Sequence, residues 1–166
     1  MGEVTWPLEQ NMIRGQKVSN TFGMVRTYAN GTPKPHQGWD FAAAVGTPAY
    51  AIADGKIEFI ADSGAYGTQI CMSFAWKDQQ TLYAFYAHMN AIMVSKDQQV
   101  TMNTMIGTCG KSGNAQNLPA SQDHLHFEIR TQAYAGLGLN KRLSPIKVFG
   151  KCPLYAIVDG NEIISF

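Results

Sequence analysis

The sequence predicts a single domain of mostly antiparallel β structure. Short extended runs, rich in β-branched and aromatic residues, are separated by turns that contain glycine. Two Asp-Gly pairs, Asp54-Gly55 and Asp159-Gly160, each separate two such runs, and Asp-Gly is a strong signal for a tight hairpin turn. Helical patterns are few, so helices are expected only as short pieces.

The first expected strands follow one another between residues 50 and 88. Residues 50–53 and 56–61 are expected to pair as a hairpin around Asp54-Gly55. Residues 67–74 and 81–88 are expected to be strands, because polar stretches bound two runs of aromatic and β-branched residues.

The later elements include one strand, one helix and a second hairpin. Residues 124–130 alternate polar and apolar side chains, as a strand with one face on the core does. Ser144-Pro145 followed by Gly150 suits a short helix with a cap, a first-turn proline and a terminating glycine. Residues 154–166 are expected to form a hairpin around Asp159-Gly160.

Composition excludes several classes of protein. Hydrophobic residues make up 45% of the 166 residues, which excludes a disordered chain. The formal net charge of +1 provides no basic field for nucleic acid, so no nucleic-acid partner is expected. No apolar run approaches the ~20 residues that a membrane-spanning helix needs. The three cysteines are widely spaced and form no CxxC motif.

The four histidines lie where they could share one site. His36 and Asp40 are four residues apart, so they share one face of an extended segment. His124 and His126, at a spacing of two, share one face of their strand. His88 ends an aromatic run. The pattern therefore predicts that all four imidazoles serve one centre.

Catalytic zinc sites use three nitrogen or oxygen ligands and keep one position open. His36, Asp40 and either His124 or His126 could supply these ligands, and the remaining imidazoles could move protons near neutral pH. The spacing alone indicates a metal-dependent hydrolase. A non-haem iron oxygenase also uses two histidines and a carboxylate, but we expect His-x-Asp spacing there rather than His-x3-Asp.

A set of motifs lies in a fixed order between Thr21 and Arg130. They are Phe22-Gly-Met, His36-Gln-Gly-Trp-Asp40, Gly46-Thr-Pro-Ala-Tyr-Ala-Ile-Ala-Asp-Gly55, Tyr86-Ala-His88, Ile106-Gly107 and His124-Leu-His-Phe-Glu128. In this combination the chain resembles the lysostaphin-like zinc metallopeptidases, peptidase family M23, also called the LytM family.

The resemblance implies a role for each polar residue. His36, Asp40 and His126 correspond to the zinc ligands, with one Zn2+ per chain, and His88 and His124 correspond to the two catalytic histidines that do not bind metal. It also implies antiparallel sheets of the lysostaphin-like, duplicated hybrid motif type, which form a narrow groove. The implied activity is zinc-dependent hydrolysis of peptide bonds in peptidoglycan stem peptides or cross-links.

The same resemblance sets the expected boundaries and the alternative function. Residues 1–166 are expected to form one peptidase domain, with a catalytic core at about 20–131 and a C-terminal extension at about 132–166. The alternative is a catalytically silent LytM-like module that binds the wall or regulates another enzyme. A biotinyl or lipoyl carrier is disfavoured, because Lys56 follows Asp-Gly and lacks hydrophobic neighbours on both sides.

Residues beside the motifs carry further expectations. Asp123 is expected to be a solvent-facing turn residue rather than an acceptor for an imidazole N–H. Glu128 is expected either to orient a metal ligand or to pair with Arg130. Trp39 and Tyr86 are expected to pack in the core rather than line the groove.

The N-terminal residues lack the basic and apolar regions of a secretory signal. Because the implied substrate lies in the periplasm or the extracellular wall, we expect delivery by a non-Sec route or a fragment of a longer precursor. A contact-dependent toxin or a phage lysin would fit the first route. The expected partners are a peptidoglycan peptide and an inhibitory or immunity protein.

Overall fold

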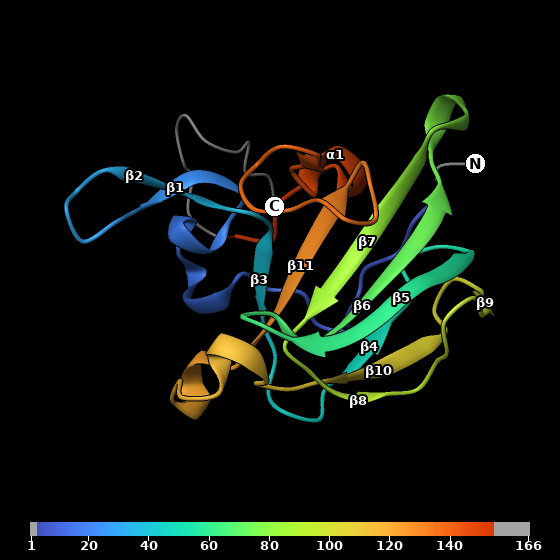
Figure 1. The fold of residues 1–166 in the computed structure, drawn as a ribbon, viewed down its shortest axis with the longest axis horizontal. Helices are drawn as coiled ribbons and strands as arrows, with labels where there is room; N and C mark the ends of the chain where they lie inside the picture. Colours follow the sequence, from blue (N-terminus) through green and yellow to red (C-terminus); the bar gives the residue numbers. More distant parts are fainter. Residues whose placement is uncertain (1–2, 155–166) are drawn as a thin grey trace.

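The computed structural model describes residues 3–154 and consists mainly of antiparallel sheets (Figure 1). The largest sheet has the strand order β12-β11-β7-β6-β5-β9, and β3 also pairs with β11. Its strands are β3 (Trp39–Ala42), β5 (Gly55–Ser63), β6 (Gly67–Ala75), β7 (Thr81–Ala87), β9 (Gln99–Val100), β11 (His124–Arg130) and β12 (Arg142–Leu143). The predicted fold class is confirmed.

Two smaller sheets complete the β structure. One has the order β4-β10-β8, with β4 at Pro48–Tyr50, β8 at Met89–Ile92 and β10 at Met105–Cys109. The other is a hairpin of β1 (Gly23–Thr27) and β2 (Pro33–His36), which projects at the left of Figure 1. The main core contains apolar residues from the large sheet and from β4-β10-β8.

Helices are short. The 3-10 helices are η1 (Arg14–Gln16), η2 (Val18–Asn20), η3 (Lys77–Gln79), η4 (Gly113–Ala115) and η5 (Ala120–Gln122), and the α-helix is α1 (Ile146–Phe149). α1 is the predicted helix after Ser144-Pro145, and Gly150 ends it with a left-handed φ of 80°. In the part of the chain that the structure describes, no helix is both long and apolar enough to cross a membrane.

The strands predicted at residues 67–74, 81–88 and 124–130 are confirmed as β6, β7 and β11. Trp39 and Tyr86 are fully buried, as predicted, and the Tyr86 hydroxyl donates a hydrogen bond to the carbonyl of Tyr50 (2.8 Å). The hairpin predicted for residues 154–166 lies, apart from Leu154, outside the described residues.

The prediction of a hairpin around Asp54-Gly55 is wrong. β4 pairs with β10, whereas Gly55 begins β5, which pairs with β6 and β9. Gly55 is required there by close strand approach, because a Cβ atom would overlap the carbonyl oxygen of Ser73. The Asp54 carboxylate accepts a hydrogen bond from the backbone N–H of Met102 (2.8 Å).

Candidate metal centre

The strand register brings three potential metal ligands together. β11 lies between β3 and β7, so that His126 is directly opposite Asp40 on one side and Ala87 on the other. His36 is the last residue of β2. The chain after it passes close to β11 at Gly38, where a Cβ would overlap the backbone of Phe127, and this close approach brings His36 near Asp40 and His126. One ligand atom each of His36, Asp40 and His126 lies within 4.8 Å of the other two.

Hydrogen bonds orient both candidate imidazole ligands. The Nδ1 atom of His36 lies 2.8 Å from the carbonyl oxygen of Thr21, which can only accept, so Nδ1 carries the proton. The unprotonated Nε2 of His36 then faces Oδ1 of Asp40 at 3.2 Å. His126 contacts the same oxygen through Nδ1 at 2.9 Å, and its Nε2 contacts Glu128 at 2.8 Å. Nε2 of His36, Nδ1 of His126 and Oδ1 of Asp40 therefore converge.

The two carboxylates determine the charge of His126 in the metal-free protein. Burial lowers the pKa of His126, but its hydrogen bonds to Asp40 and Glu128 outweigh burial and raise this pKa to about 9. Burial raises the pKa of Asp40, yet the facing imidazoles lower it well below its usual range. An ionised Asp40 can therefore attract a cation.

The second pair of histidines borders the same centre. The rings of His88 and His124 lie 5.0 Å apart. Nδ1 of His88 donates to the carbonyl of Ser112 (2.8 Å), and Nδ1 of His124 donates to the carbonyl of Gln122 (3.0 Å). Burial lowers the pKa of both, that of His88 to about 4. Both are therefore neutral at pH 7, with Nε2 free to accept a proton.

The backbone at His88 is strained. Its φ of 59° lies in the left-handed region, which costs a residue with a side chain about 1–2 kcal/mol. Hydrogen bonds hold this conformation, because the backbone N–H donates to the carbonyl of Tyr66 (2.8 Å) while the ring is fixed by Ser112. Strained residues cluster at functional sites, and His88 directly follows β7 at the centre.

Two arginines that the sequence did not single out hold Asp40. Its second oxygen, Oδ2, accepts hydrogen bonds from Arg14 and Arg26, each at 3.0 Å. Asn20 accepts from the same two guanidinium groups, at 2.8 and 3.0 Å. This arrangement leaves Oδ1 of Asp40 to the imidazoles.

Glu128 contacts both of the partners that the sequence suggested, the candidate ligand His126 and Arg130. Its Oε2 contacts His126, and its Oε1 accepts from Nε of Arg130 and from Nε of Arg142, both at 2.7 Å. Burial raises the pKa of Glu128, but the opposite effect of His126 and the two arginines is larger. The net pKa is lowered, so the fully buried carboxylate stays ionised. Arg142, on β12, was not predicted to take part.

A hydrogen-bonded chain connects this centre to the segment after β11. The Tyr66 hydroxyl donates to Oε2 of Glu128 (3.1 Å) and accepts from the side-chain amide of Gln37. The backbone N–H of Gly138 donates to Oε1 of Gln37 (2.6 Å), and Arg142 donates to the carbonyl of Gly138 (2.8 Å). Residues beyond 131 thus support the centre.

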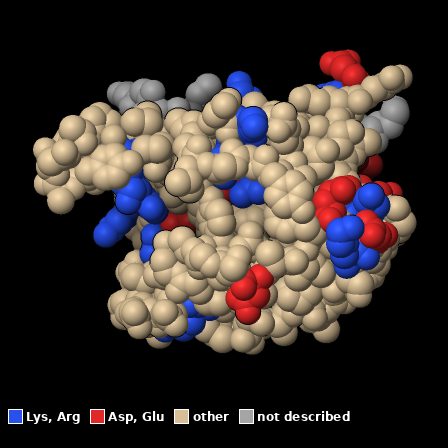
Figure 2. All heavy atoms as spheres, in the orientation of Figure 1, with Lys and Arg blue, Asp and Glu red and all other residues tan. Residues whose placement is uncertain are grey.

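A groove of about 790 Å³ opens over the centre. The hairpin β1-β2 and the η4 region contribute to opposite parts of its lining, and Figure 2 shows a hollow between the upper and lower parts of the molecule. The polar and aromatic residues lining it include Arg26, Tyr28, Lys34, His36, Gln37, Asp40, Tyr66, Gln69, His88, Asn114, His124 and His126. The candidate metal ligands are therefore accessible to a molecule that binds in the groove.

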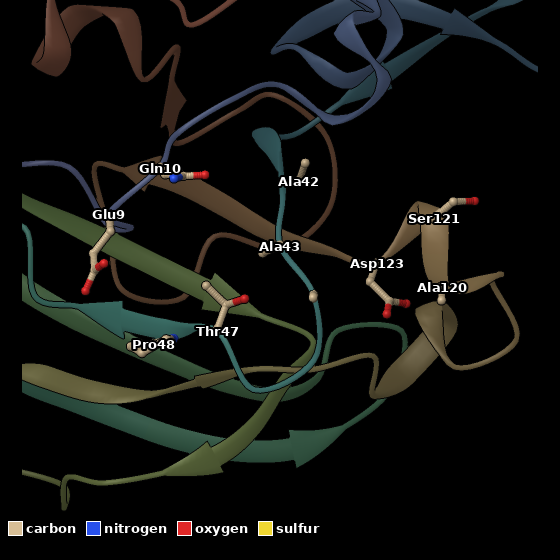
Figure 3. Close-up of a pocket in the computed structure, with 10 residues that line it drawn as sticks. Glu9, Gln10, Ala42, Ala43, Thr47, Pro48, Ala120, Ser121 and Asp123 are labelled. Carbon is tan, nitrogen blue, oxygen red and sulfur yellow. The ribbon is translucent and has the colours of Figure 1, made fainter.

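The prediction that Asp123 faces solvent is wrong. Its side chain is 7% exposed, and it forms an ion pair with Lys111 (3.5 Å). Asp123 lines a separate hollow of about 420 Å³, with Ala43 and Thr47 from the loop after β3 (Figure 3). The backbone N–H of Ala43 donates a hydrogen bond to the backbone carbonyl of Asp123 (3.2 Å), which fixes the position of Asp123 beside this loop.

A profile of peptidase family M23 matches residues 34–137, a segment that contains all four histidines and Asp40. The chain belongs to peptidase family M23. The resemblance seen in the sequence is thereby confirmed, and the matched segment extends from β2 into the loop that precedes β12.

Relatives of this M23 chain carry names of peptidoglycan enzymes. It is 33% identical to the DD-carboxypeptidase/endopeptidase Mpg of Neisseria meningitidis over 69% of this chain and 24% of Mpg. It is 28% identical to the peptidoglycan DD-endopeptidase ShyB of Vibrio cholerae over 91% of this chain and 32% of ShyB. The chain spans 20–32% of the length of its first curated relatives.

Solved structures agree with the M23 fold. The catalytic domain of lysostaphin from Staphylococcus simulans has a TM-score of 0.62 and 25% identity, over 79% of this chain and 90% of that domain. A zinc-containing peptidase from Vibrio cholerae has a TM-score of 0.64 and 24% identity, over 84% and 37% of the two chains. The antiparallel, lysostaphin-like architecture predicted from the sequence is confirmed.

Proposed function

We propose that this chain is a zinc-dependent endopeptidase that hydrolyses peptide bonds in bacterial peptidoglycan stem peptides or cross-links. One observation carries the proposal. In a member of family M23, donor atoms of His36, Asp40 and His126 lie within 4.8 Å of one another at the floor of an open groove. The names of the relatives support peptidoglycan as the substrate.

The donor set fits zinc in composition. Two imidazole nitrogens and one carboxylate oxygen, without a thiolate, are ligands of catalytic rather than structural zinc sites. Partners of the second ring nitrogens, Thr21 for His36 and Glu128 for His126, are the outer contacts that metal-binding histidines ordinarily have. Zinc in such a site supplies a Lewis acid that polarises water and the scissile carbonyl group.

His88 and His124 are proposed to transfer the proton of the attacking water to the leaving group. Each presents a neutral ring whose Nδ1 is occupied by a backbone carbonyl, so Nε2 can take a proton from the attacking water. The protonated ring can then donate to the developing oxyanion or to the leaving amine. Only one proton leaves the water, so one ring of this pair, whose centres lie 5.0 Å apart, carries it to the leaving amine, and a ring can donate to the oxyanion only while it is protonated.

The test combines metal analysis with product analysis. Purified protein should hold about one zinc ion and release muropeptides from sacculi, and a chelator should abolish release until zinc is restored. His36→Ala should lose both metal and activity. His124→Ala should keep the metal while turnover falls by about 10²–10⁴-fold, the size of a lost acid–base contribution.

Asp97→Ala is the matched control, because this carboxylate is 61% exposed and lies outside the groove. It should retain both zinc and activity. Full wall-cleaving activity in both histidine variants would contradict the proposal. Zinc binding and sacculus binding without any released muropeptide would support the silent wall-binding alternative instead.

The site of action that we propose is the periplasm or the extracellular cell wall. A core at residues 20–131 with an extension at 132–166 stays a prediction. Delivery as a toxin or phage lysin and the existence of an inhibitory partner also stay predictions.

A further inference from the structure

The hairpin β1-β2 places two cations side by side on the wall of the groove. Arg26 and Lys34 are directly opposite each other in the antiparallel register, and both line the groove. Residues opposite each other in such a pair project from the same face, and like charges in this position destabilise the pair. The register therefore places a second positive charge, that of Lys34, beside Arg26 on the wall of the groove.

The charge of Arg26 already has partners. Its guanidinium donates to the backbone carbonyl of Ser19 (2.7 Å) and to Asp40 (3.0 Å). Lys34 differs, because within residues 3–154 it forms no ion pair, and its ammonium lies 5.4 Å from the centre of the Tyr28 ring. Lys34 is thus the cation of the groove that is available to a ligand.

No acidic side chain of the described groove lining is available to balance the charge of Lys34. Asp40 is the only acidic residue among the described residues that line it, and Arg14 and Arg26 already contact that carboxylate. In Figure 2, Lys and Arg atoms lie at the left beneath β1 and β2, whereas acidic and basic atoms are mixed at the right, where Lys56 and Lys96 pair with Glu58 and Asp97. The groove therefore favours an anionic ligand.

The position of Lys34 also limits where that anion can be. Lys34 and His36 are two residues apart on β2, so both side chains project from one face. Two residues of strand span about 7 Å, roughly the length of two residues of an extended peptide. A substrate carboxylate that contacts Lys34 would therefore lie within about two residues of the peptide bond that is cleaved beside His36.

We propose that Arg26 and Lys34 form a carboxylate subsite, with Lys34 as the contact residue, which makes this enzyme select peptides that carry a free carboxylate close to the cleaved bond. The inference rests on the proposed function, since it names the class of peptide that the same groove accepts. A side-chain carboxylate and a C-terminal carboxylate share this chemistry, and the experiment separates them.

The experiment compares three forms of one cross-linked stem-peptide dimer with the zinc-loaded enzyme: all carboxylates free, only the C-terminal ones amidated, and only the side-chain ones amidated. The wild type should cleave the free form with a kcat/KM about three- to tenfold higher than the form whose relevant carboxylate is amidated, as expected for one charged contact. Lys34→Met should lose this preference by slowing cleavage of the free form alone. Lys34→Glu should reverse it.

Lys77→Met is the matched control, because Lys77 also lies over an aromatic ring, that of Trp76 at 5.2 Å, but outside the groove. It should leave the preference intact. Equal rates for all three dimers, or a preference that persists in Lys34→Met, would overturn the inference while leaving the peptidase function in place. If no dimer is cleaved, the proposed function fails, and equal binding of the three dimers by fluorescence anisotropy would overturn the inference independently.

Discussion

Two buried carboxylates, Asp40 and Glu128, contact His126 from opposite ring nitrogens, and each divides its oxygens in the same way. One oxygen faces His126 and the other accepts from two arginines: Arg14 and Arg26 for Asp40, at 3.0 Å, and Arg130 and Arg142 for Glu128, at 2.7 Å. The difference lies in the remaining neighbours. Oδ1 of Asp40 also faces His36, whereas Oε2 of Glu128 is closed off by Tyr66.

This difference separates binding from support. Asp40 shares its open side with two imidazoles and lines the groove, so a cation can reach it. Glu128 is fully buried and does not line the groove, and it contacts groove-lining residues such as His126 and Tyr66 from behind. The arginines of Asp40 are 13% and 29% exposed, while those of Glu128 are 5% and 0% exposed. Removing the charge of Asp40 should therefore have a different consequence from removing the charge of Glu128.

The largest effect is expected from Asp40→Asn. Losing the anionic ligand should lower zinc affinity by more than about a hundredfold, beyond the loss typical of an outer contact, and activity should fall with it. Its arginines reach water, so the free energy of unfolding should fall by only about 1–2 kcal/mol. Competition with a chromogenic chelator and urea unfolding of the metal-free protein measure the two quantities.

Asp97→Asn serves as the control for Asp40→Asn, since it removes the same charge from an exposed position. Unchanged zinc affinity in Asp40→Asn would show that Asp40 is not a ligand, and its contacts would then be those of a structural ion-pair network.

Glu128→Gln is expected to show the opposite balance. Zinc affinity should fall by about 10–100-fold, because Nε2 of His126 loses its charged acceptor. The free energy of unfolding should fall by about 3–5 kcal/mol, because Arg130 and Arg142 remain buried without a counter-charge. The same two measurements apply, and a smaller loss of stability than in Asp40→Asn would erase the distinction between the two carboxylates.

The spacing of residues singled out Asp40 and the four histidines, and the resemblance to family M23 chose His126 rather than His124 as the third candidate ligand. Period-two alternation predicted that His124 and His126 share a face, and the register with β3 adds Asp40 opposite His126. Glu128 was expected to orient a ligand or pair with Arg130, and it contacts both His126, a candidate ligand, and Arg130. The shared faces depend on local periodicity, which the sequence displays directly, whereas the contact between Asp40 and His126 depends on the pairing of β3 with β11.

The arginines of Asp40 could not be predicted in the same way. Arg14 lies in η1 and Arg26 in β1, 26 and 14 residues from Asp40, and no periodicity relates them to it. The hairpin at Asp54-Gly55 was mispredicted for a related reason. Gly55 is fixed by the approach of Ser73 on β6, a tertiary contact, rather than by the turn that Asp-Gly favours locally.

The last effect concerns protons and follows from the position of His126 between the two carboxylates. In the metal-free protein its pKa is raised to about 9, so at pH 7 it is an imidazolium that donates to both Asp40 and Glu128. Coordination through Nδ1 requires loss of that proton, whereas His36, whose pKa is lowered by burial, is already neutral. Zinc binding at pH 7 should thus release about one proton, and apparent affinity should rise about tenfold per pH unit from pH 7 to about 9.

Calorimetry in buffers of different ionisation enthalpy measures the released proton, and chelator competition measures the slope. In Glu128→Gln, His126 loses one of the two acceptors that raise its pKa, so the pH at which affinity levels off should move toward neutrality. Affinity that is independent of pH above 7 in the wild type would mean that His126 is neutral without metal. In that case Glu128 would act on the orientation of the ring alone, and its charge would not be linked to the metal equilibrium.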